Sequence, residues 1–164
     1  MLPLPTPPPD ETFRIALFEG RRHDLWSLFE LADASAASIC SYLDRGALHL
    51  ATIGGMPVGH SQVLELEPGV YELRSLAVVP RRRRRGLATR LVARSAAWVR
   101  ERSGTRLVTG AASAALDVLG FYLRLGFRVV RVERDAYGPE RGYPEGLLAH
   151  GIPVRDRIWL ELEL

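Results

Sequence analysis

Alternating and helical runs of hydrophobic residues divide the chain into strands and helices. Alternation with β-branched and aromatic residues predicts strands at residues 13–19, 47–53, 57–66, 72–79, 105–109, 127–133 and 157–164. Apolar residues three and four positions apart predict helices at residues 24–32, 35–43, 87–102 and 116–125. We expect Ser35 to be the N-cap of the second helix and Gly126 to end the last helix in a left-handed conformation.

The order of these elements is a strand, two helices, three strands joined by glycine-containing turns, and then helix, strand, helix, strand, strand. This order predicts a mixed α/β fold in which helices cover a sheet. We expect one domain at residues 12–164, after a proline-rich, mobile tail at residues 1–11. A loop rich in Gly, Pro, Tyr and Arg separates the last two strands at residues 135–156. It is either a lid that contacts substrate or a surface excursion without a role.

The composition excludes several classes of site. All 22 basic residues are arginine, so the Walker phosphate loop, which needs a lysine, is excluded, and no Gly-x-Gly-x-x-Gly dinucleotide pattern occurs. The single cysteine, Cys40, permits no internal disulfide and no cysteine-based metal cluster, and we expect it to be a small buried apolar residue rather than a nucleophile.

No apolar run reaches the ~18 residues of a membrane-spanning helix. The first residues lack the pattern of a signal peptide, so we expect a cytoplasmic protein.

The most informative stretch joins the fourth strand to the long helix. The strand stops at Pro80, five arginines follow at residues 81–85, and Gly86 opens the helix. The N–H groups of a first helical turn have no partner within the helix, and the helix dipole adds partial positive charge, so phosphate binds well there. Arginine adds forked donors, and glycine lets a ligand approach the main chain. We interpret the loop as a diphosphate site. The alternatives are a solvated basic loop or a nucleic-acid patch, but the aromatic residues that single-strand binding needs are absent around it.

At these residues the chain resembles the GNAT superfamily of N-acetyltransferases. Arg83-x-x-Gly86-x-Ala88 fits the family's acetyl-CoA loop, and it follows Leu-Ala-Val-Val-Pro at residues 76–80. Gly-Phe-Tyr-Leu-Arg-Leu-Gly-Phe at residues 120–127 is similar to a second family element. The resemblance implies a GNAT-like α/β fold, with a central, mostly antiparallel sheet of about seven strands flanked by four helices. It also implies direct transfer of an acetyl group from acetyl-CoA, without a metal, to a primary amine of a small molecule or a protein.

The resemblance further implies which residues hold acetyl-CoA. They lie on the strand, the loop and the first helical turn: Leu76, Val78, Val79, Arg83, Arg84, Arg85, Gly86, Leu87, Ala88 and Thr89. The main-chain N–H of Val78 would stabilise the oxyanion, and the backbones of Val78 and Val79 would pair with the pantetheine arm. Relatives often carry an asparagine ahead of the Phe-Tyr pair. This chain contains none, and Ser113 is the candidate substitute.

Two residues are candidates for proton transfer. Tyr122, which in the family lies beside the CoA sulfur, is the candidate acid, and the alternative is a core aromatic whose hydroxyl is satisfied. Glu72 is the candidate base because some relatives carry a glutamate at this place on the strand. The alternative is an exposed strand glutamate paired with Arg74. Period-two geometry would put Glu72 and Arg74 on one face with Leu76 and Val78.

The sequence leaves other functions open. His60 is a second candidate base, although a lone strand histidine is usually structural. The fold could also serve a non-catalytic module that binds acyl-CoA or a partner protein. We expect neither nucleic acid nor membrane as a partner. Family members often form homodimers, and nothing in the sequence decides this point or names the acceptor.

Overall fold

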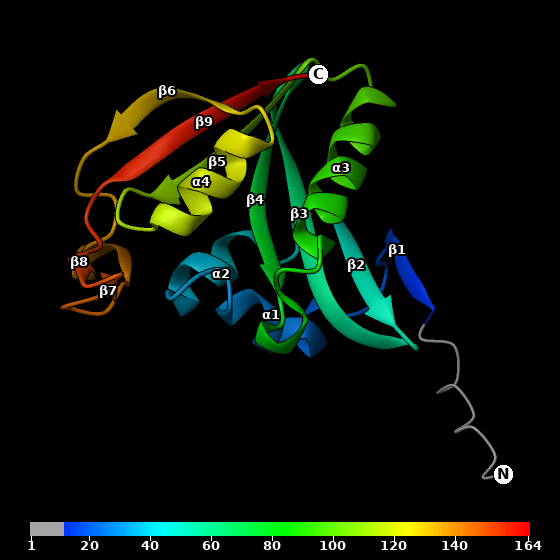
Figure 1. Ribbon diagram of the computed structural model, residues 1–164, viewed down its shortest axis with the longest axis horizontal. Coiled ribbons are helices and arrows are strands. Elements are labelled where there is room, and N and C mark those ends of the chain that lie inside the picture. Colours follow the sequence, from blue (N-terminus) through cyan, green and yellow to red (C-terminus); the bar gives the residue numbers. More distant parts are fainter. Residues whose placement is uncertain (1–11) are drawn as a thin grey trace, which may run out of the picture.

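The computed structural model describes residues 12–164, so the tail predicted at residues 1–11 lies outside the described residues. A seven-stranded sheet in the order β1-β2-β3-β4-β5-β9-β6 organises the domain (Figure 1). Its strands are β1 (Phe13–Leu17), β2 (Ala47–Ile53), β3 (Met56–Glu67), β4 (Val70–Val78), β5 (Arg106–Ala112), β6 (Arg128–Glu133) and β9 (Arg157–Glu163). All neighbours are antiparallel except β4 and β5, which are parallel and are connected through α3 (Leu87–Arg100).

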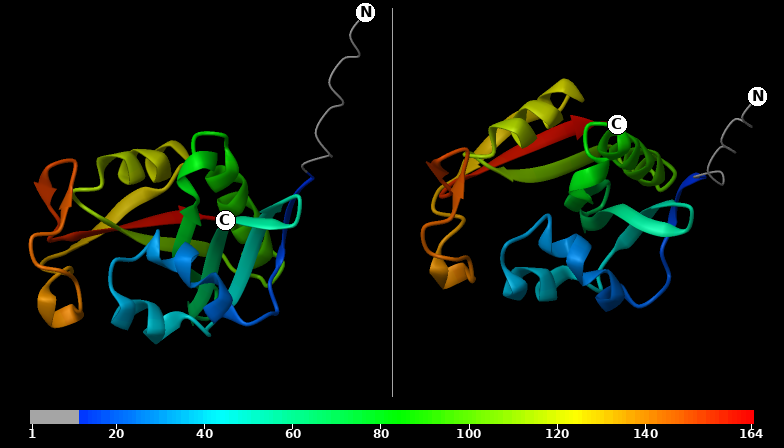
Figure 2. Two further views of the ribbon diagram at one scale, coloured as in Figure 1. Left: turned by 90° about the horizontal axis from the view of Figure 1, so that it is seen from below. Right: turned by 60° about the horizontal axis from the view of Figure 1, so that its bottom comes forward.

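Helices cover both faces of the sheet. A short 3-10 helix (Arg22–Leu25), α1 (Trp26–Glu30) and α2 (Ala36–Tyr42) lie on one face, and α3 and α4 (Leu116–Arg124) lie on the other (Figure 2). Each group buries its own hydrophobic cluster against the strands. The expected mixed α/β fold, with seven sheet strands and four α-helices, is therefore confirmed. Within residues 12–164, no helix is long and apolar enough to cross a membrane.

The predicted elements are all present, with ends that differ by a few residues. The Ser35 hydroxyl caps α2 by accepting the N–H of Ser38 at 3.1 Å, and Gly126 follows α4 with a φ of 92°. β5 continues past residue 109 to Ala112 because β9 pairs with it along its whole length. The segment 135–156 is not structureless: it contains a 3-10 helix (Pro139–Arg141) and a small hairpin of β7 (Leu148–Ala149) and β8 (Ile152–Pro153).

The expectation that Cys40 is buried was wrong, because its side chain is exposed. Helix α2 turns Ile39 and Tyr42 toward the sheet, where they are 1% and 2% exposed. Each step along a helix rotates the side chain by ~100°. The residue directly after Ile39 is therefore carried out to solvent.

A β-bulge in β4 changes which face of the sheet its later side chains point to. The pairing with β3 slips by one residue at Arg74, which has no partner on β3. Arg74 faces α2, where it donates to the hydroxyl of Ser38, whereas Leu76 and Val78 pack in the clusters beneath α3. The prediction that these three residues share one face with Glu72 was therefore wrong, because simple alternation does not count the bulged residue.

Strands β4 and β5 separate partway along their length. They pair only from Val70 to Glu72 of β4, and β4 then continues to Val78 without a partner on that side. Figure 1 shows the two strands diverging from the end at which they pair. We call the space between residues 73–78 and residues 109–112 the β4–β5 opening. Thr109 bridges its narrow end by donating its hydroxyl to the Leu73 carbonyl at 3.0 Å.

Candidate active site

The free edge of β4 directs main-chain groups into the β4–β5 opening. The N–H of Val79 donates to the Val58 carbonyl on β3 at 2.9 Å. Successive residues of a strand point their backbone groups to opposite edges, so the N–H and C=O of Leu76 and Val78 point away from β3. These two residues therefore offer backbone groups to a ligand in the opening. The N–H of Val79, which was also expected to do so, is already engaged with β3.

The arginine loop is held against the end of β4. Nε of Arg83 donates to the Val78 carbonyl at 2.9 Å, so this exposed residue ties the loop to the end of the strand. Arg84 has a φ of 58° and Gly86 a φ of 75°, both in the left-handed region. Main chain that includes left-handed residues can gather N–H groups into a concave anion site. Arg84 and Arg85 are exposed beside it.

The N-terminus of α3 has no side-chain cap. Gly86 occupies the N-cap position, and no side chain accepts a hydrogen bond from the first turn. A Cβ atom at Gly86 would meet nothing within 4 Å, so the space in front of the helix is open. The first-turn residues are Leu87, Ala88 and Thr89. Their N–H groups and the positive end of the helix dipole therefore face open space, which is the arrangement that binds phosphate.

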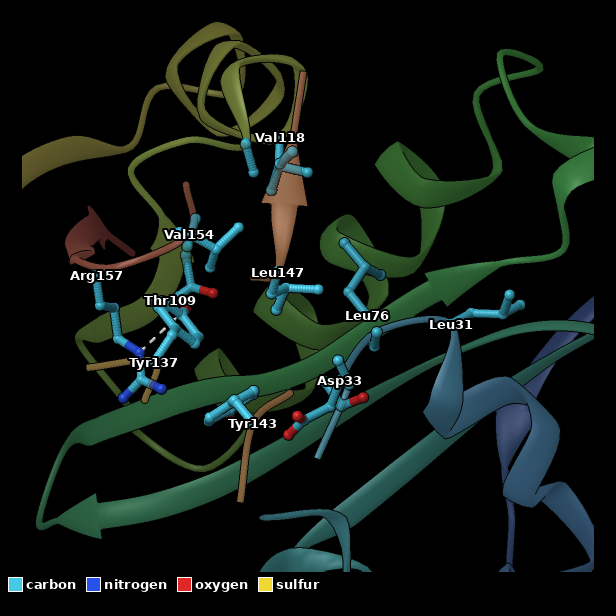
Figure 3. Close-up of a pocket in the computed structure, with 18 of the residues that line it drawn as sticks. Leu31, Asp33, Leu76, Thr109, Val118, Tyr137, Tyr143, Leu147, Val154 and Arg157 are labelled. Carbon is cyan, nitrogen blue, oxygen red and sulfur yellow. Dashed lines mark hydrogen bonds between the residues drawn. The ribbon is translucent and has the colours of Figure 1, made fainter. Parts of the chain in front are cut away.

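A cavity of about 430 Å³ lies next to the β4–β5 opening (Figure 3). Strands β4 and β5 form its floor, and the loop after α1, helix α4 and residues 137–154 form its walls. Leu31, Leu76, Val118, Leu147 and Val154 give it an apolar lining. Its polar lining includes Asp33, Arg74, Thr109, Tyr122, Tyr137, Tyr143 and Arg157. The volume lies within the ~300–1,000 Å³ typical of small-molecule sites.

Tyr122 connects the cavity to the narrow end of the opening. Its ring is 5% exposed and makes edge contacts with Phe121 and Phe127 at centroid distances of 5.1 and 5.2 Å. Burial raises the pKa of the Tyr122 hydroxyl to about 12, although a hydrogen bond with Thr109 opposes the shift. The hydroxyl is therefore neutral at pH 7 and can donate a proton. Tyr122 is both a packed core aromatic and a residue that lines the cavity.

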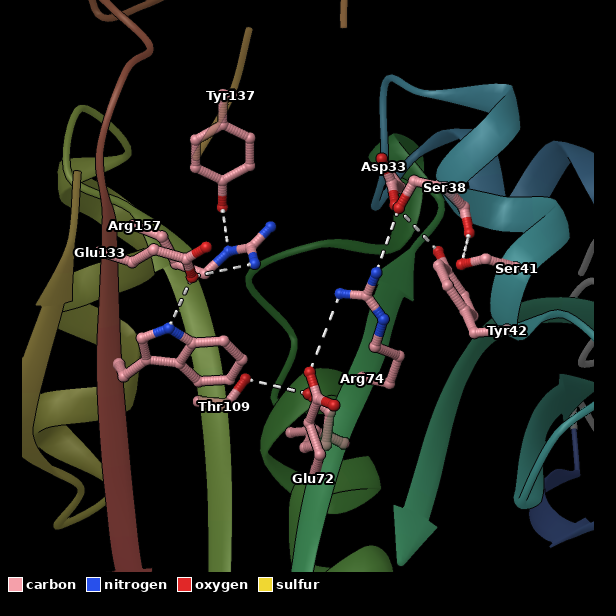
Figure 4. Close-up of polar contacts among 12 residues, drawn as sticks. Asp33, Ser38, Ser41, Tyr42, Glu72, Arg74, Thr109, Glu133, Tyr137 and Arg157 are labelled. Atoms are coloured by element: carbon pink, nitrogen blue, oxygen red, sulfur yellow. Dashed lines mark hydrogen bonds and ion pairs between the residues drawn. The ribbon is translucent and has the colours of Figure 1, made fainter. Parts of the chain in front are cut away.

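Glu72 lies behind Arg74 rather than in the cavity wall. It is 8% exposed, and its Oε1 lies 3.8 Å from Nη1 of Arg74, an ion pair visible in Figure 4. Burial raises the pKa of the Glu72 carboxyl, opposed by the charges of Arg74, Arg157 and Arg45. The pair with Arg74 that sequence suggested exists, but the glutamate is buried rather than exposed. Glu72 is absent from the residues that line the cavity.

Two other expected residues also lie outside the cavity lining. His60 is fully buried. Its ring packs at a tilt against Phe29, with centroids 4.4 Å apart, and its Nε2 lies 2.7 Å from the Ser75 hydroxyl. Burial lowers its pKa to about 3, so it is a neutral core residue. Ser113 uses its N–H to bond the Asp156 carbonyl at 2.8 Å, which ties the end of β5 to the segment before β9.

Asp33 and Arg157 line the cavity, although nothing in the local sequence pattern singles them out. Asp33 accepts hydrogen bonds from the Ser35 N–H at 3.0 Å, the Ser38 hydroxyl at 2.6 Å and the Tyr42 hydroxyl at 3.3 Å (Figure 4). In sequence, Asp33 reads as a turn residue before a helix, and Arg157 as the first residue of the last strand. Only their long-range position reveals them.

Together these features describe an open, uncapped helix N-terminus suited to an anionic ligand, beside a cavity of small-molecule size. The sequence model of the acetyltransferase (GNAT) family matches residues 11–127, which is more than half of the chain. The chain therefore belongs to the acetyltransferase (GNAT) family, a family of acyltransferases.

Individual relatives agree with this assignment. The "Uncharacterized N-acetyltransferase YvbK" of Bacillus subtilis (strain 168) is 27% identical over 154 residues, which cover 94% of this chain and 98% of that protein. The solved structure described as "IAA acetyltransferase from Bacillus cereus ATCC 14579" is 27% identical, covers 93% of this chain and 100% of its own, and superposes with a TM-score of 0.85. A Bacillus subtilis acetyltransferase solved in complex with CoA is 27% identical, covers 93% and 99% of the two chains, and has a TM-score of 0.84.

Proposed function

We propose that this protein transfers the acetyl group of acetyl-CoA directly to a primary amine of a small molecule. The observation that carries the proposal is that one strand, β4, borders both the cavity that contains Tyr122 and the loop that leads to the uncapped end of α3. A solved relative of 27% identity binds CoA. The partly enclosed cavity favours a small amine over a protein side chain as the acceptor.

The residues of this chain fit a CoA-type ligand. The open space at Gly86 and the uncapped first turn of α3 suit the paired phosphates. Exposed Arg84 and Arg85 supply forked donors beside them. The N–H and C=O of Leu76 and the N–H of Val78, which β3 leaves unpaired, suit an amide-containing arm that runs along the free edge of β4; the Val78 carbonyl is already bonded to Arg83.

When bound, acetyl-CoA supplies an activated acetyl group as a thioester. In this proposal, Tyr122 holds a proton for the leaving sulfur, and Thr109 positions the tyrosine hydroxyl at the narrow end of the opening. The N–H of Val78 donates to the developing negative charge on the carbonyl oxygen. The walls of the cavity orient the amine, which supplies a further share of the acceleration.

The acceptor amine must also lose a proton, because its ordinary pKa of ~10.4 leaves it mostly charged at neutral pH. We propose that Glu72 takes this proton through water, since its carboxylate does not itself line the cavity. Asp33, which lines the cavity directly, is the residue to compare with it. A larger loss of kcat in Asp33→Asn than in Glu72→Gln, at equal CoA affinity, would move the role to Asp33.

Calorimetry with CoA and a screen of small amines with labelled acetyl-CoA test the proposal. We expect CoA binding, acetylation of at least one amine class, and release of one free thiol for each acetyl transferred. A CoA-binding protein that acetylates no amine would instead be the non-catalytic module. Binding of DNA without binding of CoA would reject the assignment of the arginine loop.

A further inference from the structure

Arg157 of β9 lies across the neighbouring strand β5 to reach the cavity. A Cβ atom on Gly110 would lie 2.6 Å from Cδ of Arg157, so the missing side chain provides the path for the arginine stem. Glycine weakens a strand interior, and in this position it often marks the close approach of another group. Arg157 therefore lines the same cavity as Tyr122, although β5 lies between its own strand, β9, and β4.

The guanidinium of Arg157 has unused donor capacity. Its Nε donates to the Tyr137 hydroxyl at 3.3 Å and its Nη1 to Oε2 of Glu133 at 3.4 Å, both long bonds. Within residues 12–164 its Nη2 donates no hydrogen bond, and the side chain is 13% exposed. Figure 4 shows Arg157 and Arg74 approaching from opposite sides, from β9 and β4 respectively. A mostly buried guanidinium with an unpaired donor is suited to a ligand that accepts hydrogen bonds.

The charge near Arg157 is not balanced by protein carboxylates. Glu133 is its nearest acidic partner, but Glu133 also accepts from Nη1 of Arg141 at 2.8 Å and from the indole N–H of Trp159 at 2.9 Å. Glu133 thus offsets two guanidinium groups, and Glu72, whose carboxyl the charge of Arg157 also affects, is already paired with Arg74 at 3.8 Å. Asp33, on the other wall, is occupied by three donors of its own. The Arg157 side of the cavity therefore keeps an excess positive charge.

We infer that Arg157 binds a carboxylate of the acceptor, so that the substrate is an amine that also carries a carboxylate, such as an amino acid. Guanidinium and carboxylate match in charge and in forked geometry. The apolar wall that includes Leu147 and Val154 contacts the rest of the molecule. This inference rests on the proposed function, because it names the class of amine that the same cavity accepts.

A binding experiment tests the inference without requiring transfer. The CoA-loaded protein is titrated with pairs of amine-free acids and their amides: 3-phenylpropionate with 3-phenylpropanamide, and hexanoate with hexanamide. We expect at least one acid to bind ~10-fold or more tightly than its amide, as for a hydrogen bond to a charged group. Arg157→Gln should abolish that preference while the amide binds as before. Equal affinity of acid and amide in every pair, including no binding of either, overturns the inference.

Three further variants separate recognition from a structural role. Gly110→Ala should displace the arginine stem and reproduce the loss of carboxylate preference although the charge is still present. Arg157→Lys should keep part of the preference, because it keeps the charge and loses the fork. Arg131→Gln is the matched control: Arg131 stacks on Trp159 but does not line the cavity, so the preference should persist. Loss of preference in Arg131→Gln would overturn the inference, since any nearby charge would then suffice.

Transfer assays distinguish failure of this inference from failure of the proposed function. Phenylalanine, phenylalaninamide and phenethylamine carry the same amine with a carboxylate, an amide or neither. We expect kcat/KM for phenylalanine to fall ~10-fold or more in Arg157→Gln, with little change for the other two. Equal losses for all three would show a merely structural role. Acid preference without acetylation of any amine would refute the proposed transfer and leave the carboxylate site standing.

Discussion

Replacing Tyr122 by phenylalanine would remove one hydroxyl from the β4–β5 opening and keep the ring contacts with Phe121 and Phe127. Thr109 would still donate to the Leu73 carbonyl, so the fold loses one neutral hydrogen bond, worth about 1 kcal/mol. The catalytic loss should be much larger than that loss of stability suggests.

The magnitude follows from the pKa of the hydroxyl. At about 12, it lies above the ~8.5 of an ordinary thiol, so complete proton transfer to a thiolate is uphill. The tyrosine therefore acts by sharing its proton as the sulfur departs. We expect kcat to fall ~100-fold, the lower end of the range for general acids, with CoA affinity unchanged. Because the hydroxyl stays neutral well above pH 7, its titration should not lower the wild-type rate between pH 7 and 9.

The assay follows release of the CoA thiol in the steady state, with CoA affinity measured separately by calorimetry. Tyr71→Phe is the matched control, because Tyr71 is also 5% exposed and does not line the cavity. It should leave kcat unchanged. An unchanged kcat in Tyr122→Phe, or an equal fall in both variants, would refute the acid role of Tyr122.

The remaining predictions concern the cofactor loop and stability. Gly86→Val should weaken CoA binding at least ~10-fold. Gly54→Val is the control: Gly54 has a φ of 55° and equally open space, so its substitution carries similar strain but should leave CoA binding unchanged. Calorimetry measures the CoA affinity of both variants, and equal CoA affinities would show that the loop is misassigned. Burial lowers the pKa of His49 to about 4 and that of His60 to about 3, whereas both have ordinary pKa values near 6.5 in the unfolded chain. As the pH falls below 6.5, the unfolded chain therefore binds more protons than the folded protein. Stability should therefore drop between pH 6.5 and 4, by ~2 kcal/mol for each histidine at pH 5, and a flat urea midpoint across that range would contradict this. Arg22 donates to the carbonyls of residues 43, 45 and 46 at 2.6–2.9 Å, so Arg22→Ala should lower the free energy of unfolding by about 2 kcal/mol. Urea denaturation measures this change, and an unchanged midpoint would show that these three hydrogen bonds add nothing.

Features with local causes could be predicted from the sequence. The Ser35 cap and the left-handed Gly126 are each decided by the chemistry of a few neighbouring residues. The same holds for Gly86, whose position after a proline-stopped strand and five arginines is enough to indicate an open helix end. The prediction that Cys40 is buried was wrong because residue type alone does not say which side of a helix faces the sheet.

The sequence by itself therefore determined the element order, the family and the loop suited to phosphate. Only the tertiary structure decided the bulge at Arg74, the separation of β4 from β5, and the meeting of Asp33 with Arg157, more than a hundred positions apart in the chain, in one cavity. Gly110 shows the physical reason most clearly. Within its strand it is only a weak β-former, and its use appears when β9 pairs beside it and lays Arg157 across the gap. Such contacts depend on strand pairing between distant segments, which local hydrophobic patterns do not encode.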